Sequence, residues 1–490
     1  MRRRKEYFRI RRLARRYDRK SGKFTISVSY ETATPKPSDR VVAVAEGFGL
    51  GLDKWERFVI YDNVQISISQ TDIVYITGDS GSGKSVLLRA LLKDLGDEAV
   101  DMNAIPIDSA RPLIETVGKT VEEGLELLSR VGLNDAFLFL RNYDQLSDGQ
   151  RYRYKIAKLI ESGKQFWLFD EFCATLDRDT AKIVAFNVQK LARALGKAVV
   201  AATTHMDLFE DMKPSVHVHK RFGEEISIKY YPNTAAQECS LMAEMRVEKG
   251  TTKEWKKLAS FHYRSHRAGA VRKIFCLKRR DEELCGVIAY CYSPPEAYGR
   301  RMVLPRMTIG EINQKLSIIS RVVVHPKYRT IGLGRRLIQE TLPLVGTEYV
   351  EMPAVMAKYN PFAERAGMRR ITEQHPSKDV LKIVNVLEEV GFKAQLLGSQ
   401  NYVFDVLRNL SSANLERVRE AFAKGGHVRF LKYFSSDLPF GHKEEYKEAV
   451  RTADLVKLAG LIKICGFLLQ TKVYLFWQRP KRALKRRKKC

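Results

Sequence analysis

The chain has 490 residues, more than one compact core usually accommodates, so two or three domains are expected. Its composition, 44% hydrophobic and 29% charged, is typical of folded soluble proteins and excludes a wholly disordered or membrane-embedded chain. The formal net charge of +28 favours polyanionic partners, and nucleic acid is the default expectation.

Positive charge is concentrated at both ends of the chain. The start, MRRRKEYFRIRRLARR, lacks the apolar core of a signal peptide, and residues 1–40 are expected to form a basic arm. The other end, Arg479–Lys489, reads RPKRALKRRKK. We favour contact of both ends with phosphate backbones over a role in solubility alone. The seven cysteines form no C-x-x-C pair, which indicates neither a zinc site nor a disulfide framework and fits a reducing cytoplasm.

The rest of the chain divides by pattern into three parts. Residues 41–230 alternate short apolar runs with helical patterns, which predicts an α/β domain, and residues 243–370 form a second α/β stretch. Residues 371–490 form a mixed extension of helical segments and a few strand-like runs. Its most apolar stretch, Leu455–Trp477, is interrupted by three lysines, so we expect no membrane span and no membrane partner.

The first chemical motif follows a predicted strand at Ile73–Ile76 and precedes a helical pattern. It reads G-x-x-x-x-G-K-S and consists of Gly78, Asp79, Ser80, Gly81, Ser82, Gly83, Lys84 and Ser85. A glycine-rich loop lets backbone N–H groups surround phosphates, Lys84 places a cation at the β and γ phosphates, and the Ser85 hydroxyl can ligate Mg²⁺. The motif in this setting predicts ATP binding.

A second apolar strand, Phe166–Phe169, ends in two carboxylates. Asp170 is expected to hold the Mg²⁺ shell. Glu171 is expected to polarise the water that attacks the γ-phosphate. Together with the phosphate loop, the pair predicts hydrolysis of ATP.

Further motifs in the same order resemble those of ABC ATPases. Ser147, Gly149 and Gln150 belong to a run, LSDGQ, that resembles the signature loop, Ala174–Asp177 resembles the D-loop, and His205 follows a strand as the switch histidine does. The resemblance implies a homodimer through these domains, in which each signature loop closes on the partner's nucleotide.

One departure from the ABC pattern concerns the segment between Ser85 and Asp144. It contains no glutamine, so the usual Q-loop residue, which in transporters couples hydrolysis to a membrane subunit, is missing. That absence argues against a transporter subunit. The aromatic residue that stacks on adenine stays open among Trp55, Phe58 and Tyr61.

The second α/β stretch carries another strand–loop–helix pattern. It includes Val323, Val324, Arg329, Gly332, Leu333 and Gly334, with a His-Pro pair after the strand. The R-x-x-G-x-G run resembles the acyl-CoA loop of GNAT acetyltransferases, and residues 360–368 resemble the family's closing helix and turn. The resemblance implies that acetyl-CoA binds here with its pyrophosphate at the start of the helix.

The general acid of this second site is not determined by the pattern. Many GNAT enzymes carry a tyrosine at the position of Ala363, so substitutes must come from elsewhere, and Tyr359, Tyr263 and His262 stay as unranked candidates. Residues 349–368, with Phe261–Arg264 upstream, are loosely similar to phage Mom-like proteins, GNAT-fold enzymes that modify DNA bases.

The order of the motifs resembles a family of archaeal and bacterial fusions of an ABC ATPase with a GNAT domain. The leading hypothesis is an ATP-dependent N-acyltransferase that modifies RNA or DNA bases, with ATP, Mg²⁺ and acetyl-CoA as its ligands. A protein N-acetyltransferase with a regulatory ATPase is one alternative. A nucleic-acid-binding ABC ATPase with an inactive GNAT domain is the other.

Overall fold

The computed structural model describes the chain in ranges separated by short gaps. These ranges are 8–32, 38–49, 56–133, 135–261, 269–280, 282–355, 357, 360–425, 427–434 and 443–480. The chain forms two compact units, the first comprising Met1–Ala289 with Arg321–Thr341 and the second Tyr290–Ser320 with Leu342–Cys490. Two of the three breaks, after Ala289 and after Ser320, fall inside strands, and the third follows a helix that ends at Thr341.

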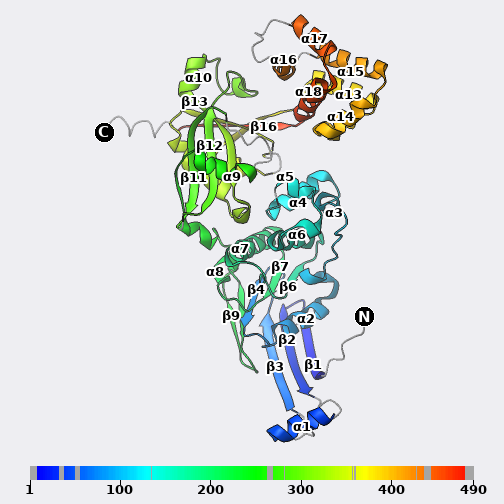
Figure 1. The fold of residues 1–490 in the computed structure, drawn as a ribbon. Coiled ribbons are helices and arrows are strands. Elements are labelled where there is room, and N and C mark those ends of the chain that lie inside the picture. Colours follow the sequence, from blue (N-terminus) through cyan, green and yellow to red (C-terminus); the bar gives the residue numbers. More distant parts are fainter. Residues whose placement is uncertain are drawn as a thin grey trace, which may run out of the picture. The chain divides into compact units, whose positions relative to one another are not determined.

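A six-stranded sheet forms the centre of the first unit, in the order β5-β6-β7-β4-β8-β9 (Figure 1). Its strands are β4 (Ile73–Gly78), β5 (Ala99–Asp101), β6 (Phe166–Phe169), β7 (Ala198–Ala202), β8 (Val216–Lys220) and β9 (Ile226–Tyr230). The first five in spatial order are parallel, and β9 runs antiparallel to β8. Helices cover both faces, which explains why β4, β6 and β7 are buried along their whole length.

The helices that pack on this sheet form two groups. One face and the insert that follows β5 carry α3 (Leu113–Thr116), α4 (Val121–Arg130), α5 (Ala136–Phe139), α6 (Asp148–Glu161), α7 (Arg178–Leu195) and α8 (Phe209–Met212). The other face carries α2 (Lys84–Leu95). The α/β architecture predicted for this part of the chain is thus confirmed.

An antiparallel sheet, β1-β2-β3, packs on the same core as α2. It consists of β1 (Phe8–Asp18), β2 (Lys23–Thr32) and β3 (Glu56–Ser67), with α1 (Asp39–Phe48) between β2 and β3. Alternate apolar residues of β2 are buried, namely Phe24, Ile26 and Val28. Residues 8–32 therefore belong to the packed domain, whereas the sequence pattern placed them in an arm that ends at residue 40.

Part of the positive charge of this segment is paired within the chain. Arg15 forms an ion pair with Asp94 of α2, and Arg19 lies 3.0 Å from a carboxylate oxygen of Glu98. Both acids stand at the end of α2 or just after it. The expected basic arm thus contributes to the surface of the ATPase domain, while residues 1–7 and 481–490 lie outside the described ranges.

A seven-stranded sheet has the order β10-β11-β12-β13-β14-β16-β15. Its strands are β10 (Met245–Gly250), β11 (Val271–Arg279), β12 (Leu284–Tyr292), β13 (Leu316–Val324), β14 (Tyr349–Ala354), β15 (Arg369–Gln374) and β16 (Lys472–Gln478). β13 and β14 are parallel and pair over Leu316–Ile318 and Tyr349–Glu351. The pairs β10–β11, β14–β16 and β15–β16 are antiparallel.

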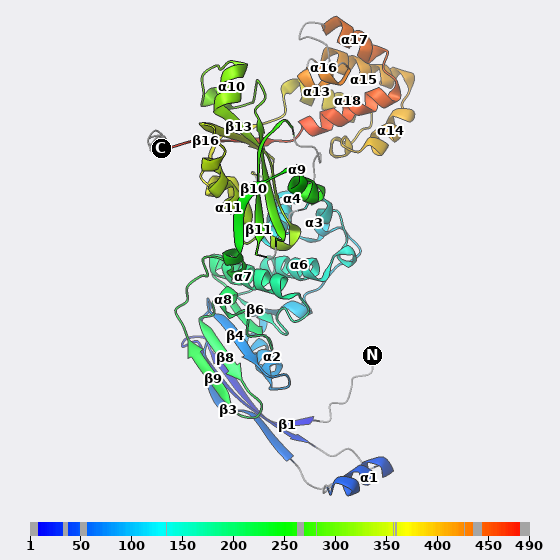
Figure 2. The same ribbon diagram turned by 60° about the vertical axis from the view of Figure 1, so that its left-hand side comes forward.

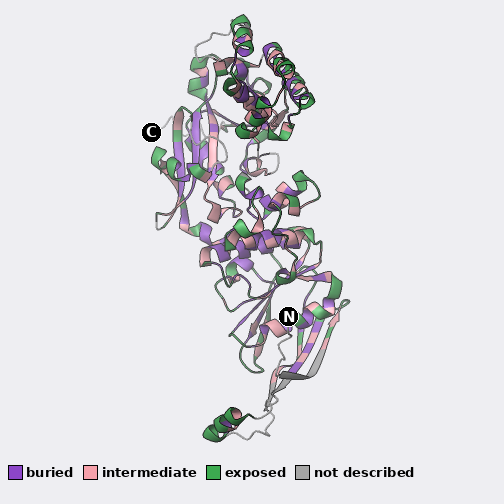
Figure 3. Ribbon diagram, turned by 45° about the vertical axis from the view of Figure 1, so that its right-hand side comes forward, coloured by how far each residue is buried: buried purple, intermediate pink, exposed green. Residues whose placement is uncertain are grey.

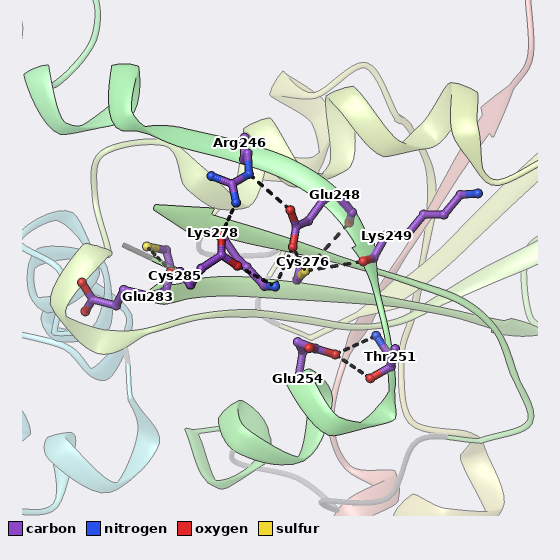
Figure 4. Close-up of polar contacts among 10 residues, drawn as sticks. Arg246, Glu248, Lys249, Thr251, Glu254, Cys276, Lys278, Glu283 and Cys285 are labelled. Carbon is purple, nitrogen blue, oxygen red and sulfur yellow. Dashed lines mark hydrogen bonds and ion pairs between the residues drawn. The ribbon is translucent and has the colours of Figure 1, made fainter. Parts of the chain in front are cut away.

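Short helices connect these strands. They are α9 (Thr252–Leu258), α10 (Ile309–Lys315), α11 (Leu333–Thr341) and α12 (Phe362–Arg365). The edge strand β10 carries Arg246 and Glu248, and Lys278 on β11 lies 2.6 Å from Glu248 (Figure 4). Charges on an edge strand discourage pairing with another chain, so this edge is protected.

The residues after β15 form a helical bundle, in which α13 to α18 gather around one core (Figure 2). The helices are α13 (Lys378–Glu389), α14 (Gln400–Arg408), α15 (Ser412–Lys424), α16 (Val428–Phe434), α17 (Lys443–Arg451) and α18 (Leu455–Leu468). Buried and exposed positions alternate around them, as amphipathic packing requires (Figure 3). β16 then pairs between β14 and β15, so the predicted extension 371–490 is a bundle followed by a strand of the sheet.

The apolar stretch near the end of the chain is split between α18 and β16, which bury it separately. Across the described ranges, each helix falls short of the length and apolarity that crossing a bilayer demands.

Candidate functional site

The phosphate loop between β4 and α2 is shaped by two glycines with close neighbours. Gly78 has φ +138°, and a Cβ there would lie 1.8 Å from the carbonyl oxygen of Lys220 on β8. Gly83 has φ +100°, and a Cβ there would lie 2.4 Å from Cγ2 of Ile60. No other residue fits these positions. The loop is therefore held by its neighbours on β8 and β3, and α2 begins at Lys84 with its first N–H groups at the loop.

The side chain of Lys84 lies inside this loop and is only 8% exposed. Its Nζ donates to the carbonyl oxygen of Gly78 at 2.9 Å and of Asp79 at 2.5 Å. Burial lowers the pKa of Lys84, while the nearby carboxylates of Asp79 and Asp170 act in the opposite direction. The ammonium group of Lys84 is thus held inside the phosphate loop, where the phosphate oxygens of a bound nucleotide would contact it.

Ser85 and Asp170 meet at the carboxyl edge of the sheet, where β4 and β6 both end. The Ser85 hydroxyl donates to Oδ1 of Asp170 at 2.8 Å. Hydroxyl and carboxylate oxygens are ligands that Mg²⁺ prefers, and this pair fits such an ion.

Glu171 follows directly and is exposed, with its backbone N–H donating to the Asp170 carboxylate at 3.1 Å. Its φ of +54° is uncommon for a residue with a side chain, and Cys173 repeats it at +56°. Such backbone strain is retained where the surrounding structure fixes it, typically at functional sites.

Asn103 is a polar residue at this edge that the sequence patterns did not reveal. It follows β5, the neighbour of β6, and its Nδ2 lies 3.5 Å from the carbonyl oxygen of Asp170. A side-chain amide therefore lies beside the backbone of Asp170 although the segment between Ser85 and Asp144 contains no glutamine. The three-residue strand before Asn103 is too short for periodicity to detect, which is why the signal was missed.

The signature run stands at the start of α6. Ser147 is the residue before the helix, and its N–H donates to Oε1 of Gln150 at 3.0 Å, so Gln150 caps its own helix. Gly149 lies close to Thr180 of α7, with 3.4 Å between Cγ2 of Thr180 and the position a Cβ would take. The D-loop residue Asp177 caps α7 in turn, accepting from Thr180 N–H at 3.1 Å.

Two further residues singled out by the sequence are His205 and Tyr61. His205 comes after β7, and its carbonyl oxygen accepts a hydrogen bond from Tyr75. Tyr61 is 1% exposed and donates to the carbonyl oxygen of Gly83 at 3.0 Å. Tyr61 therefore packs against the phosphate loop from inside the domain, and its buried ring is not accessible for stacking on adenine. The side chains of the other two adenine candidates, Trp55 and Phe58, lie outside the described residues.

Comparison with known proteins agrees with this geometry. Residues 61–174 match the ABC transporter family. This part of the chain is an ABC ATPase domain. Methionine import ATP-binding proteins MetN are among its relatives, that of Corynebacterium efficiens at 29% identity over 199 residues and that of Streptococcus pyogenes serotype M28 at 28% over 193 residues. The two matches cover 33% and 31% of this chain and 54% of each relative, so the chain spans about half the length of these curated relatives.

Among solved structures, the chain is similar to the ATP-binding cassette MJ0796 in a dimeric post-hydrolysis state bound to ADP and Pi. The identity is 20% and the TM-score 0.30, covering 36% of this chain and 92% of that one.

The second glycine-containing loop, expected from the run Arg329–Gly334, lies outside the ABC ATPase domain but within the same unit. It follows β13 through Pro326–Tyr328 and leads into α11, so the expected strand, turn and helix are all present. Gly332 is exposed with φ +95° and open space around it. Val323 and Leu333 are buried beneath it, with Val324 and Gly334 partly buried at its two sides.

Arg329 in this loop is directed inward. Its Nε donates to the carbonyl oxygen of Val324 at 3.3 Å, and burial lowers its pKa while Asp135 of the ABC insert favours the charged form. Arg329 thus fixes the turn. The open positions left for an anion are backbone groups of Gly332 and of the first turn of α11.

The acid and base of the second site are not identified among the described residues. His262, Tyr263 and Tyr359 all lie outside the described ranges. Ala363 is fully buried in α12, which agrees with its lack of an ionisable group. His325 packs edge-on against Phe261 at 5.2 Å between ring centroids, and burial lowers its pKa.

Proposed function

We propose that the chain is an ATPase that hydrolyses ATP between two copies of its ABC domain. The observation that carries this is the meeting of Ser85 and Asp170 at 2.8 Å beside Lys84. Lys84 binds the β and γ phosphates, Glu171 orients the attacking water and accepts its proton, and His205 stands at the next strand end. When bound, Mg²⁺ offsets the negative charge of the phosphates. Asn103 is placed to position water or metal through its amide.

We further propose that the second loop binds an acyl-CoA and that the chain transfers the acyl group to an amine. Three features support this. The parallel pair β13 and β14 is joined by α11, whose start carries the R-x-x-G-x-G loop. The glycine at 332 has an open approach. A short helix and a positive-φ glycine at position 367 follow β14, as the closing segment of GNAT enzymes implies.

The acceptor that the charge favours is nucleic acid. The formal net charge of the chain is +28, a sum that already includes the acids paired with Arg15 and Arg19. A base amine must leave the stack to react, at a cost of a few kcal/mol, which gives ATP hydrolysis a physical use.

The deciding experiment is mass spectrometry after incubation with labelled acetyl-CoA, Mg-ATP and, in separate reactions, tRNA, duplex DNA and purified basic proteins. Label on a nucleoside supports the proposal, and label confined to protein replaces it with protein N-acetylation. If no acyl group is transferred and no CoA binds at millimolar concentration, the transferase half is wrong.

The names of the relatives raise a second candidate, an ATPase that drives import with a membrane partner. One observation favours it: Phe137 and Leu140, on and just after α5 in the insert, are 61% and 71% exposed. Under this reading, Phe137→Asp removes association of the chain with membranes in its host and leaves ATP hydrolysis by the purified protein unchanged. Association that does not depend on Phe137 excludes this surface.

A further inference from the structure

The loop assigned to acyl-CoA is anchored by a buried arginine of the ABC ATPase domain. Arg153 lies on α6, the helix that begins at the signature residue Ser147, and it is only 6% exposed. Its Nη1 lies 3.3 Å from the carbonyl oxygen of Pro326 and its Nη2 3.0 Å from that of Lys327. Burial lowers the pKa of Arg153 to about 10, so it stays a cation at neutral pH. These two bonds compensate a buried charge that would otherwise be costly.

A second helix of the ATPase domain holds the same turn from another direction. Asp179 lies in the first turn of α7, two residues after the D-loop residue Asp177. Its Oδ2 accepts from Nζ of Lys327 at 2.6 Å and from Nη1 of Arg279 at 2.8 Å. Lys327 also lies 3.9 Å from the carboxylate of Asp177. The turn is thus clamped between the helix after the signature loop and the helix after the D-loop.

The clamped segment is strained. Thr330 has φ +80°, which is rare for a β-branched residue. It lies against Gly132 of the ABC insert, where an added Cβ would stand 2.7 Å from Cγ2 of Thr330 and 3.2 Å from Nη1 of Arg153. Strain of this kind persists only where neighbours fix the conformation. Here the neighbours belong to the ATPase domain.

We infer that ATP binding at the ABC domain tightens acyl-CoA binding through Arg153 and Asp179, which act as positioning residues for the loop at 326–332. The inference rests on the proposed function. α6 and α7 start at the two motifs that close on nucleotide in the expected dimer, so closure fixes both helices. A loop held by both helices then has fewer conformations to lose when it binds CoA.

The test measures coupling in the full chain, with Glu171→Gln to keep ATP intact. The dissociation constant for CoA is measured by calorimetry with and without Mg-ATP. ATP should tighten CoA binding by at least about five-fold, and CoA should tighten ATP binding by the same factor, because coupling is reciprocal. If CoA binds equally well with and without ATP, the inference is wrong while the acyltransferase proposal stands. If CoA does not bind at all, the acyltransferase proposal itself fails.

Variants then test the route. Arg153→Met and Asp179→Asn should bring the coupling factor close to one while each ligand alone still binds. Arg130→Met is the matched control, since the partly exposed Arg130 side chain pairs with Glu126 on α4 and not with the loop at 326–332 in any contact among the described residues, and coupling should persist. Arg153→Lys replaces Arg153→Met if the latter does not fold, because one ammonium group cannot reproduce both bonds to the carbonyl oxygens of Pro326 and Lys327. Full coupling in Asp179→Asn and in the Arg153 variant would overturn the assigned route.

Discussion

The two loops that follow a strand and start a helix are built alike and held differently. The loop at 78–85 is enclosed by its own domain, because Gly78 lies against β8, Gly83 lies against β3 of the neighbouring antiparallel sheet and Lys84 is bonded to the loop's carbonyl oxygens. The loop at 326–332 takes its strongest contacts from α6 and α7 of another domain. The first is preorganised by its own fold, and the second depends on a neighbour whose function is to bind nucleotide.

This difference changes how far a motif can be interpreted. A loop enclosed by its own domain keeps the same geometry wherever its strand and helix occur, so the sequence pattern is nearly sufficient to predict that geometry. A loop clamped from outside has a geometry that follows the state of the clamp. The following experiments test whether each loop binds its own ligand independently and whether the second loop depends on the ABC ATPase domain for its position.

The largest effect is expected from Glu171→Gln. The amide cannot accept the proton of the attacking water, so hydrolysis should fall by about two orders of magnitude or more while ATP still binds. Steady-state phosphate release and nucleotide retention by filtration measure this. CoA affinity without ATP should be unchanged, and wild-type turnover in the variant would remove Glu171 from the mechanism.

Ser147→Arg should reduce hydrolysis by at least about ten-fold, because a bulky cation at the start of α6 prevents that helix from approaching the partner's phosphates. Because Ser147 and Lys84 lie in different motifs, a protomer with the Ser147 change should be complemented by a protomer with a change at Lys84. A mixture of Ser147→Arg with Lys84→Ala forms one intact composite site in each heterodimer and should regain activity. Demonstrated heterodimers without activity would exclude the shared site.

Gly334→Glu should weaken CoA binding by about ten-fold or more, since a carboxylate at the start of α11 repels the pyrophosphate. Calorimetry with CoA measures the loss. ATP hydrolysis in the absence of CoA should match the wild type, because the loop at 78–85 takes no support from α11. A parallel loss of ATPase activity would mean that the loops are not chemically separate.

The smallest effect concerns the sheet beneath the ATP loop. The pKa of His217 on β8 is lowered, mainly by burial and further by the charges of the neighbouring His219 and Lys229. The Nε2 of His217 lies 2.8 Å from the hydroxyl oxygen of Thr77. The unfolded chain, in which the pKa of a histidine is about 6.5, binds the proton more readily than the folded chain does. The folded state is therefore fully stable above that pH and loses stability as the pH falls below it. The Tm should drop by roughly 2–4 °C more between pH 7 and 5 in the wild type than in His217→Gln. His375→Gln, which changes an exposed histidine, should behave as the wild type.

Individual residues show how far prediction from sequence reached. The strand before Gly78, the carboxylate pair 170–171 and the helix after Ser147 have local patterns, because periodicity and capping act over a few residues. Asn103 follows a strand too short for any pattern, so the sequence was interpreted as lacking an amide at that place. Residues 8–32 are assigned from their charge to a basic arm, although Phe24–Tyr30 alternates like a strand, and the structure shows that the apolar residues of β2 join the core.

The sequence by itself determined the residue types and spacing of the ABC ATPase domain, since each of its motifs lies within one strand, one loop and the start of one helix. It also indicated a second loop of the same kind at 329–334. Only the tertiary structure decided that Arg329 turns inward, that β16 returns to the sheet from the end of the chain, and that Arg153 and Asp179 hold the second loop. The reason is physical: these contacts join residues that are up to about 170 positions apart, and their formation depends on how whole elements pack and not on any local pattern.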